Sequence, residues 1–111
     1  MVKVNPQTNE ITLTRGDTLR VKFVTKNKDG TPYAYKTGDR LDFFAKKENA
    51  TGDAEIMEEI DTATGELVLS SEQTKSMKAN KYVYDIQLTK ANGDVDTIIN
   101  MASITIKNEV A

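Results

Sequence analysis

Hydrophobic and polar residues alternate strictly along residues 80–89 (NKYVYDIQLT). One face of this segment carries the large apolar side chains of Tyr82, Tyr84, Ile86 and Leu88. The other face is mostly polar, with Asp85, Gln87 and Thr89 beside Val83. A period of two residues is typical of a β-strand with one buried face and one wetter face. The segment therefore predicts a strand of a sheet that packs on one side.

The same alternation predicts further strands along the chain. They cover residues 11–14, 19–23, 41–46, 55–61 and 66–69, followed by a long C-terminal segment from Ile98 to Ile106. In the 41–46 segment Phe44 interrupts the polar face, and in the 55–61 segment Met57 lies opposite the apolar set. In the last segment Ile99 is out of phase with Ile104, so we expect one bent strand with a bulge near residues 100–103.

Turn signals separate these runs at short intervals. Asn92-Gly93 predicts a hairpin with a type I′ or a bulged turn, for which residues that tolerate positive φ are suited. Asp29-Gly30 predicts a similar turn, but Pro32 follows it. Proline has no amide donor, so the segment after this turn is predicted to be an edge strand or a loop.

Residues 71–78 are the one helix-tolerant segment, about two turns long. Ser70 or Ser71 is placed to cap it, and Met77 is expected to point into the core. Tyr82 then falls where β-sandwiches place a tyrosine corner, in which a buried tyrosine hydroxyl bonds the backbone a few residues upstream. An ordinary half-buried core position is the alternative interpretation of Tyr82.

These elements predict an all-β fold, an antiparallel immunoglobulin-like sandwich of seven or eight strands with one short helical turn. Residues 1–111 are expected to form a single domain with its core within about 10–110. The predicted core consists of the inward residues of the strands: Leu13, Leu19, Val21, Phe23, Leu41, Phe43, Leu67, Leu69, Tyr84, Ile86, Leu88, Ile104 and Ile106.

The amino-acid composition restricts the kinds of catalytic and binding site that the protein can form. The 111 residues include neither histidine nor cysteine, which removes the commonest general base and the thiolate nucleophiles and metal ligands. Fifteen basic and seventeen acidic residues give a net charge of −2, with no basic stripe that fits nucleic acid. No apolar run is long enough for a membrane span, and the N-terminus lacks a signal-peptide pattern. We therefore expect no enzyme activity, cofactor, metal, small-molecule substrate, nucleic acid or membrane partner.

Several short motifs have simpler structural interpretations. Arg15-Gly16-Asp17 spells an integrin-binding tripeptide, but between two strands it predicts a tight turn. Asp94 and Asp96 offer a surface calcium site only as an alternative to a solvated turn. The crowded carboxylates of residues 55–66 are expected to cover a solvated sheet face, because no aromatic platform for a sugar accompanies them.

Three aromatic residues form the candidate interaction surface. Tyr33, Tyr35 and Phe44 lie near the segment predicted to be an edge. Exposed aromatic patches mark interaction sites when they are contiguous. The sequence therefore predicts a protein-binding role for these three side chains and only structural roles for Tyr82, Asn92 and Gly93.

Taken in order, ITLTRGDTLRVKF, a DG turn, LDFFAKK, GELVLSSEQT, KYVYDIQLT and NGDV resemble a family of phage domains. These are the immunoglobulin-like β-sandwich domains of tailed-phage and prophage tail or baseplate proteins, especially the N-terminal domain of baseplate upper proteins. The resemblance covers residues from about 10 to 110 and implies a non-enzymatic structural protein. It implies a location in the virion tail or baseplate, reached through assembly in the bacterial host cytoplasm.

The partners that the resemblance implies are other phage structural subunits or further copies of the chain. Residues 2–4 and the segment with Pro32 are the expected sheet edges through which such pairing would occur. The alternative function is a small carbohydrate-binding or host-surface adhesion module, with Tyr33 and Tyr35 as the loop aromatics it would need.

Overall fold

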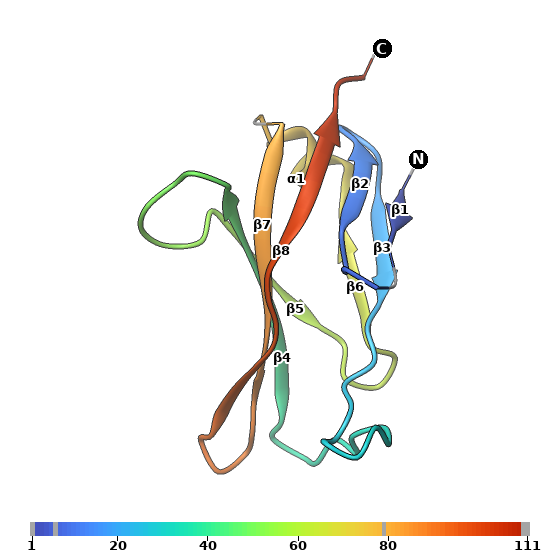
Figure 1. Cartoon of the computed structure of the whole chain (residues 1–111), viewed down its shortest axis with the longest axis vertical. Coiled ribbons are helices and arrows are strands. Elements are labelled where there is room, and N and C mark those ends of the chain that lie inside the picture. The colour runs from blue at the N-terminus through green and yellow to red at the C-terminus, as the bar shows by residue number, and fades with distance from the viewer. Residues whose placement is uncertain (1, 6, 79, 110–111) are drawn as a thin grey trace.

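The computed structural model describes residues 2–5, 7–78 and 80–109 (Figure 1). Its elements are β1 (Lys3–Val4), β2 (Ile11–Thr14), β3 (Leu19–Lys22), β4 (Arg40–Lys47), β5 (Ile56–Ile60), β6 (Glu66–Leu69), α1 (Ser71–Lys75), β7 (Lys81–Thr89) and β8 (Val95–Lys107). The chain is thus mostly β, with one short helix among the described residues. The C-terminal segment is a single long strand, as the sequence predicted.

The strands form two sheets of unequal size. The larger sheet has the order β1-β2-β8-β7-β4-β5, and β3 pairs with β6 in the smaller one. A single bridge between Asp61 and Glu66 links the end of β5 to the start of β6. The larger sheet curls around the β3–β6 pair (Figure 1).

The prediction of a wholly antiparallel arrangement is wrong at one pairing. β2 runs parallel to β8, with Ile11 opposite Ile104 and Leu13 opposite Ile106. The tight turn after β2 sends the chain into the other sheet, so β2 does not pair with its sequence neighbour β3. It joins the edge of β8 instead, and its direction there is set by the path of the chain. Alternating residues report which face is buried, but they carry no information on strand direction.

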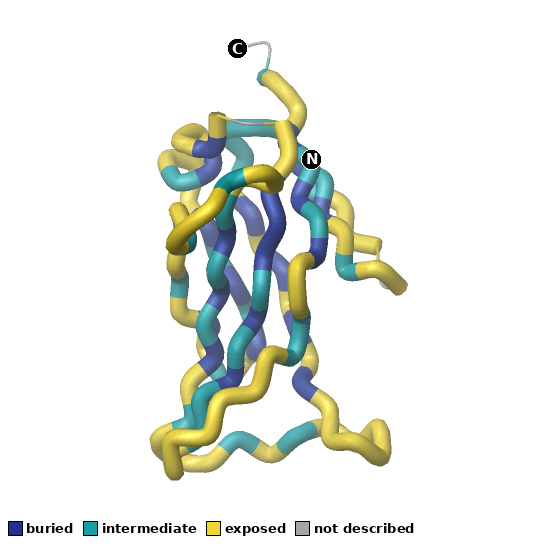
Figure 2. Tube along the Cα trace, turned by 60° about the vertical axis from the view of Figure 1, so that its left-hand side comes forward, coloured by how far each residue is buried: buried dark blue, intermediate teal, exposed yellow. Residues whose placement is uncertain are grey.

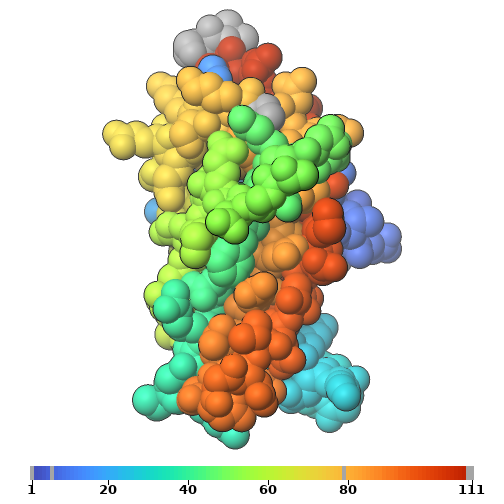
Figure 3. All heavy atoms as spheres, turned by 90° about the vertical axis from the view of Figure 1, so that its left-hand side faces the viewer, coloured from blue at the N-terminus to red at the C-terminus, as the bar shows by residue number. Residues whose placement is uncertain are grey.

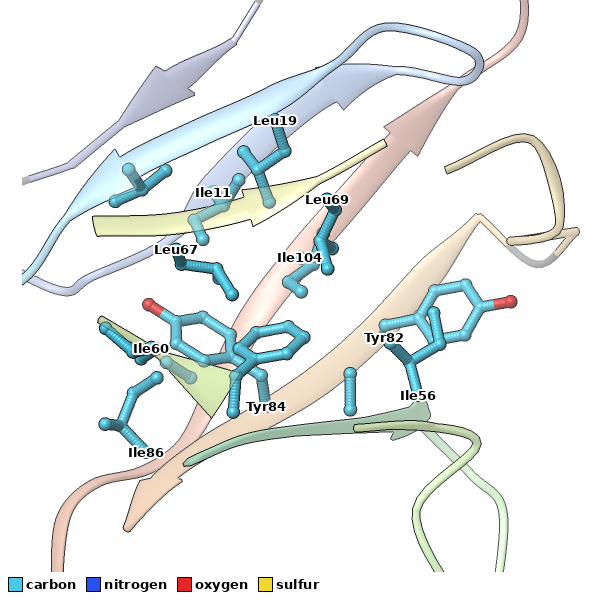
Figure 4. Packing of buried hydrophobic residues seen from close by; sticks show 14 of the residues in the cluster. Ile11, Leu19, Ile56, Ile60, Leu67, Leu69, Tyr82, Tyr84, Ile86 and Ile104 are labelled. Carbon is cyan, nitrogen blue, oxygen red and sulfur yellow. The ribbon is translucent and has the colours of Figure 1, made fainter. Parts of the chain in front are cut away.

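The hydrophobic core lies between the two sheets (Figure 4). All thirteen predicted core residues are buried, with exposed fractions of 8% or less. Buried positions alternate along the strands, and most exposed positions lie in the connecting turns (Figure 2). The core also includes buried residues outside the predicted list: Ile11, Ala45, Ile56, Ile60, Met77, Tyr82 and Ala102.

Helix α1 is short, but its start is well defined. The Ser70 hydroxyl accepts the Gln73 amide, and the Gln73 side chain accepts the Ser70 amide, which makes a complete capping box. The helix holds the turn at residues 15–17: Thr74 Oγ1 accepts the Gly16 amide and donates to the Asp17 carbonyl. Arg15 binds Glu109 at 2.7 Å. The tripeptide is therefore a tight turn, as predicted.

The predicted bulge lies in β8. Tyr84 is opposite Ala102 and Ile86 is opposite Ile99, so Asn100 and Met101 together face Asp85. A second irregularity follows at Ile98. This arrangement explains why Ile98 and Ile99 are both half-buried against the core although they are neighbours.

The turns also follow the sequence. The Asn92-Gly93 turn takes the bulged form, because Gly93 donates to the Lys90 carbonyl and Gly93 alone of the pair has a positive φ, at 97°. After the Asp29-Gly30 turn, Pro32 makes one isolated bridge to Lys26. The segment that follows is a loop, not an edge strand. The edges of the larger sheet are β1 and β5.

Two tyrosines of β7 are buried in different ways. Tyr84 packs between Phe23 and Phe43, and its hydroxyl donates to the Asn9 carbonyl at 2.6 Å. Burial raises the pKa of Tyr84 to about 12. Tyr82 is fully buried at the start of β7. The backbone upstream of it includes residue 79, which lies outside the described residues, so the tyrosine corner stays a prediction.

Candidate interaction surface

The outer face of the larger sheet points away from the core and carries several apolar side chains. Pairing places Met57 of β5 opposite Phe44 of β4, and Phe44 opposite Asp85 of β7. Met101 continues this row at the bulge of β8. Met57 and Met101 are 63% and 60% exposed. A solvated sheet face is normally polar, so this row, which is apolar apart from Asp85, marks a surface that is suited to contact.

A hollow of about 400 Å³ opens on this face beside Phe44. Its walls are Phe44, Val83 and Met101 on the sheet, residues 52–54 of the β4–β5 loop, and polar side chains that include Lys46 and Asp85. The loop, drawn in green, crosses the face above the orange segment of β7 and β8 (Figure 3). Val83 is only 8% exposed although it lies outside the core cluster, because the outer-face residues around the hollow cover it.

Met101 is held in an unfavourable backbone conformation. Its φ of 52° lies in the left-handed region, where a side chain with a Cβ costs about 1–2 kcal/mol. The Asp85 carboxylate accepts the Met101 amide at 2.7 Å and fixes the bulge. Glycine or asparagine would suit this backbone better, yet an exposed methionine occupies it. The bulge therefore presents an apolar side chain at the rim of the hollow.

The strain at Met101 gives a direct prediction. Met101→Gly is expected to be more stable than Met101→Ala by about 1 kcal/mol, because only glycine adopts the left-handed conformation without a penalty. Both variants remove the same exposed side chain, so the alanine variant is the matched control. Chemical denaturation monitored by circular dichroism measures the difference. Equal stabilities would show that residue 101 does not hold its positive φ.

Charged residues flank the row on two sides. Lys46 lies two residues beyond Phe44 on β4, and Asp42 lies two residues before it. Glu59 of β5 is the cross-strand neighbour of Asp42. Asp42 already binds Arg40 at 3.0 Å. Within the part of the chain that the structure describes, the Lys46 side chain makes no hydrogen bond or ion pair, whereas Asp42 and Glu59 together raise the pKa of Arg40.

The structure brings together two of the three aromatic residues predicted to bind a partner. The rings of Tyr33 and Tyr35 meet edge to face, 5.3 Å apart, and both pack against the core. Phe44 lies elsewhere, on the outer face beside the hollow. Sequence proximity to Pro32 suggested a single patch, but β4 turns Phe44 outward while the loop carries the tyrosines against the core.

The two tyrosines are tied into the end of the domain. The Tyr33 hydroxyl donates to Asp39 at 2.8 Å, and the hydroxyls of Tyr35 and Thr25 share a hydrogen bond of 2.6 Å. Hydrogen bonds from the Lys36 amide and from Tyr33 hold the pKa of Asp39 below its ordinary value. Asp39 also accepts the Ala91 amide, which joins this loop to the β7–β8 hairpin. These aromatics therefore tie the loops at this end of the domain together, and both remain half-buried.

The other candidate groups are arranged as surface residues. Asp96 binds Lys90 at 3.4 Å, and Asp94 accepts from the Asn92 side chain at 3.3 Å. Among residues 2–5, 7–78 and 80–109, no three acidic side chains come together as a metal site would require. Sequence reasoning did not identify Met57 and Met101 as surface residues of interest. In the sequence, each of them can be recognised as an apolar residue at a strand position where the alternation predicts an outward side chain.

Comparison of the chain with protein-family models, curated proteins and solved structures finds no match. In the described part of the chain, no helix has the length and apolar character of a membrane span.

Proposed function

We propose that the chain is a non-enzymatic structural subunit of a bacteriophage or prophage particle. It acts in the virion tail or baseplate by assembling with other subunits or with further copies of itself, after synthesis in the bacterial host cytoplasm. The chain resembles tail and baseplate domains from about residue 10 to 110, and it lacks the histidine and cysteine that many catalytic sites use.

The proposal includes an immunoglobulin-like sandwich. In that fold three adjacent strands, C, F and G, lie opposite a sheet that contains B and E. Here β4, β7 and β8 are adjacent, β3 and β6 pair in the opposite sheet, and α1 lies in the connection from β6 to β7. This order supports assigning β3, β4, β6, β7 and β8 to strands B, C, E, F and G.

The single observation that carries the assembly role is the open edge at β1. The Asn5 amide donates to the Glu10 carbonyl, so Asn5 and Glu10 form a hydrogen-bonded pair. Such pairs alternate along an antiparallel ladder, so the Lys3–Thr12 pair is also bonded and the Val4–Ile11 pair is not. The amide and carbonyl of Val4 therefore point away from β2, toward the free side of the sheet.

The two edges of the larger sheet differ in their protection. β5 carries Glu58 and Glu59, and charged side chains discourage a second strand from pairing with an edge. β1 carries Lys3 as its single charge and exposes Val4. The β1 edge is therefore the one at which we expect a strand of another subunit to add.

A proline at position 4 tests this edge. Val4→Pro removes the amide that points outward and leaves the bonds from β1 to β2 in place, so the fold is expected to stay within about 1 kcal/mol of the parent. Pairing at the edge is expected to be lost, because proline cannot donate to an added strand. Pull-down with the neighbouring particle proteins and light scattering are the measurements.

Val4→Thr is the control, because it keeps both the amide and a β-branched side chain. Unchanged binding in the proline variant would rule out the β1 edge. Failure of the parent chain to associate with any particle component would argue against the virion role and leave the adhesion module as the better hypothesis.

A further inference from the structure

The smaller sheet has a free edge along β3. Within the part of the chain that the structure describes, β3 pairs with β6 alone. Just beyond that pairing the Phe23 amide donates to the Gly65 carbonyl, so residues 23 and 65 form a hydrogen-bonded pair. Such pairs alternate along an antiparallel ladder, so Lys22 opposite Glu66 is not bonded to β6. The amide and carbonyl of Lys22 therefore point toward the free side, and those of Val24 follow the same alternation.

The larger sheet has a free edge along β5, and its backbone groups can be assigned in the same way. The Glu48 amide donates to the Lys81 carbonyl, so the even-numbered residues of β4 are the ones bonded to β7. The odd-numbered residues of β4 therefore bond to β5, where they lie opposite its even-numbered residues. The amides and carbonyls of Met57 and Glu59 consequently point away from β4, toward the free side.

On both edges the outward backbone groups belong to residues whose side chains point away from the core. Burial alternates from residue 19 to residue 25, with the even-numbered residues exposed, so the extended conformation of β3 continues through Val24. Val24 and Met57 are 62% and 63% exposed, although both are large apolar residues. We define the β3 edge as Arg20, Lys22 and Val24, and the β5 edge as Met57, Glu59 and Asp61.

The two edges are complementary in one antiparallel register. With Val24 opposite Met57, the two exposed apolar side chains meet and Lys22 lies opposite Glu59. Apolar pairs and opposite charges on facing strands stabilise a sheet. A shift of two residues in one direction puts Lys22 opposite Met57, and a shift in the other direction puts Val24 opposite Glu59. A shift of one residue brings the outward backbone groups of one edge against the inward groups of the other.

We propose that copies of this chain bind head to tail, with the β3 edge of one copy pairing antiparallel with the β5 edge of the next. The added strand joins the smaller sheet of one copy to the larger sheet of the other, which is a known mode of strand addition. Met57 already lies opposite Phe44, so the apolar row of the outer face continues into Val24 of the next copy. Because the two edges differ, the copies form a ring or a filament.

The charge contact rests on Lys22 and Glu59. Glu59 lies beside Asp42 on the outer face, and Lys22 of the next copy supplies a positive charge to this acidic pair. Arg20 and Asp61, at the end of the row, are already bonded within their own copy, to Glu66 at 3.4 Å and to the turn after β5. They therefore add less to the contact than the central pair does.

The acidic side chains of β5 make its edge selective. Charged residues on an edge discourage a strand that lacks the opposite charges, which is why an unrelated subunit is expected at β1 instead. A strand that carries lysine at the matching position meets attraction. Glu58 does not enter this row, because its side chain belongs to the other face of β5, where the Gln73 side chain of α1 donates to it at 3.2 Å.

The free edges have room for a strand where the match is made. β5 is bridged to β6 only at Asp61 and Glu66, and the two strands diverge from there toward the start of β5 (Figure 1). Met57 and Glu59 lie on the diverging part. The β4–β5 loop crosses the outer face over β7 and β8 rather than the side of β5 (Figure 3).

The head-to-tail contact goes beyond the proposed function and does not depend on it. The β1 edge takes no part in the pairing of β3 with β5. The association of copies is therefore measured in the Val4→Pro background, where pairing at β1 is blocked. Loss of the particle partner at β1 and loss of self-association are then separate results.

Two charge reversals test the contact. Lys22→Glu and Glu59→Lys are each expected to raise the Kd for self-association about tenfold or more, because each places like charges opposite one another. An equal mixture of the two variants is expected to associate again. In the mixture the glutamate introduced at position 22 faces the lysine introduced at position 59, and the remaining contacts keep the original pair. Analytical ultracentrifugation over a concentration series gives the dissociation constants.

Lys107→Glu is the control, because it makes the same charge change at an exposed position of β8, which two strands separate from β5. Recovery in the mixture also shows that neither variant is misfolded. The proposal is overturned if the Val4→Pro chain is monomeric at high micromolar concentration, if the single reversals associate like the parent, or if their mixture does not recover.

Discussion

Replacing Phe43 with alanine is expected to lower the free energy of unfolding by about 3–5 kcal/mol. The Phe43 side chain is completely buried, and its ring centroid lies 5.5 Å from that of Tyr84. Tyr84 in turn contacts Phe23, which directly follows β3 of the smaller sheet. The substitution therefore leaves a cavity between the two sheets, and a domain of this size has a total stability of only about 5–15 kcal/mol.

Phe44→Ala provides the matched control. The two phenylalanines are neighbours on β4, but Phe44 lies on the outer face and its loss is expected to cost about 1 kcal/mol or less. Urea denaturation of both variants gives the comparison. Similar values for the two, or a loss below about 0.5 kcal/mol for both Phe43→Ala and Ile86→Ala, would mean that the assigned faces are wrong.

Gly65→Ala is expected to destabilise the fold by about 3–5 kcal/mol, which is at the upper end for one added methyl group. Gly65 has a φ of +72°, and a Cβ there would lie 2.3 Å from the Phe23 carbonyl oxygen. That oxygen belongs to the backbone and cannot rotate away. The Gly65 carbonyl also accepts the Phe23 amide, so any shift breaks the contact between the turn and the end of β3.

The Gly52→Ala variant measures the cost of the positive φ without the steric clash that is expected at Gly65. Gly52 has a φ of +98°, but a Cβ there has open space around it. Its cost is expected to be the left-handed penalty alone, about 1–2 kcal/mol. Thermal denaturation of the two variants measures the difference. If Gly65→Ala costs no more than Gly52→Ala, then the close approach of residues 23 and 65 does not exist in solution.

The interior of this protein could be predicted from the sequence because a strand reports its buried face at every second residue. The strict alternation in β7 identified Tyr84, Ile86 and Leu88, and the phase change at Ile98 and Ile99 located the bulge in β8. Met77 was expected to point into the core and is completely buried. Ile56 was harder to rank, because its strand carries acidic residues on both faces.

The candidate site was predicted less well, for a physical reason. An exposed methionine at a strand position looks like an irregularity in the alternation, and its meaning depends on which residues the pairing places beside it. Register joins Met57 to Phe44, and the bulge brings Met101 to the same face. Tyr33 and Tyr35, by contrast, were predicted to bind a partner, but hydrogen bonds and packing against the core hold both side chains half-buried.

The parallel pairing of β2 with β8 also bears on how the chain reaches its native state. Ile11 and Ile104 are partners in that pairing, and the ion pair from Arg15 to Glu109 spans 94 residues. These contacts close almost the whole chain into one loop, and such non-local contacts slow folding to the range of milliseconds to seconds. During synthesis β2 cannot pair with β8 until the residues up to the end of β8 have left the ribosome. Until then its apolar side chains Ile11 and Leu13 lack their native neighbours on β8 and are open to chaperones.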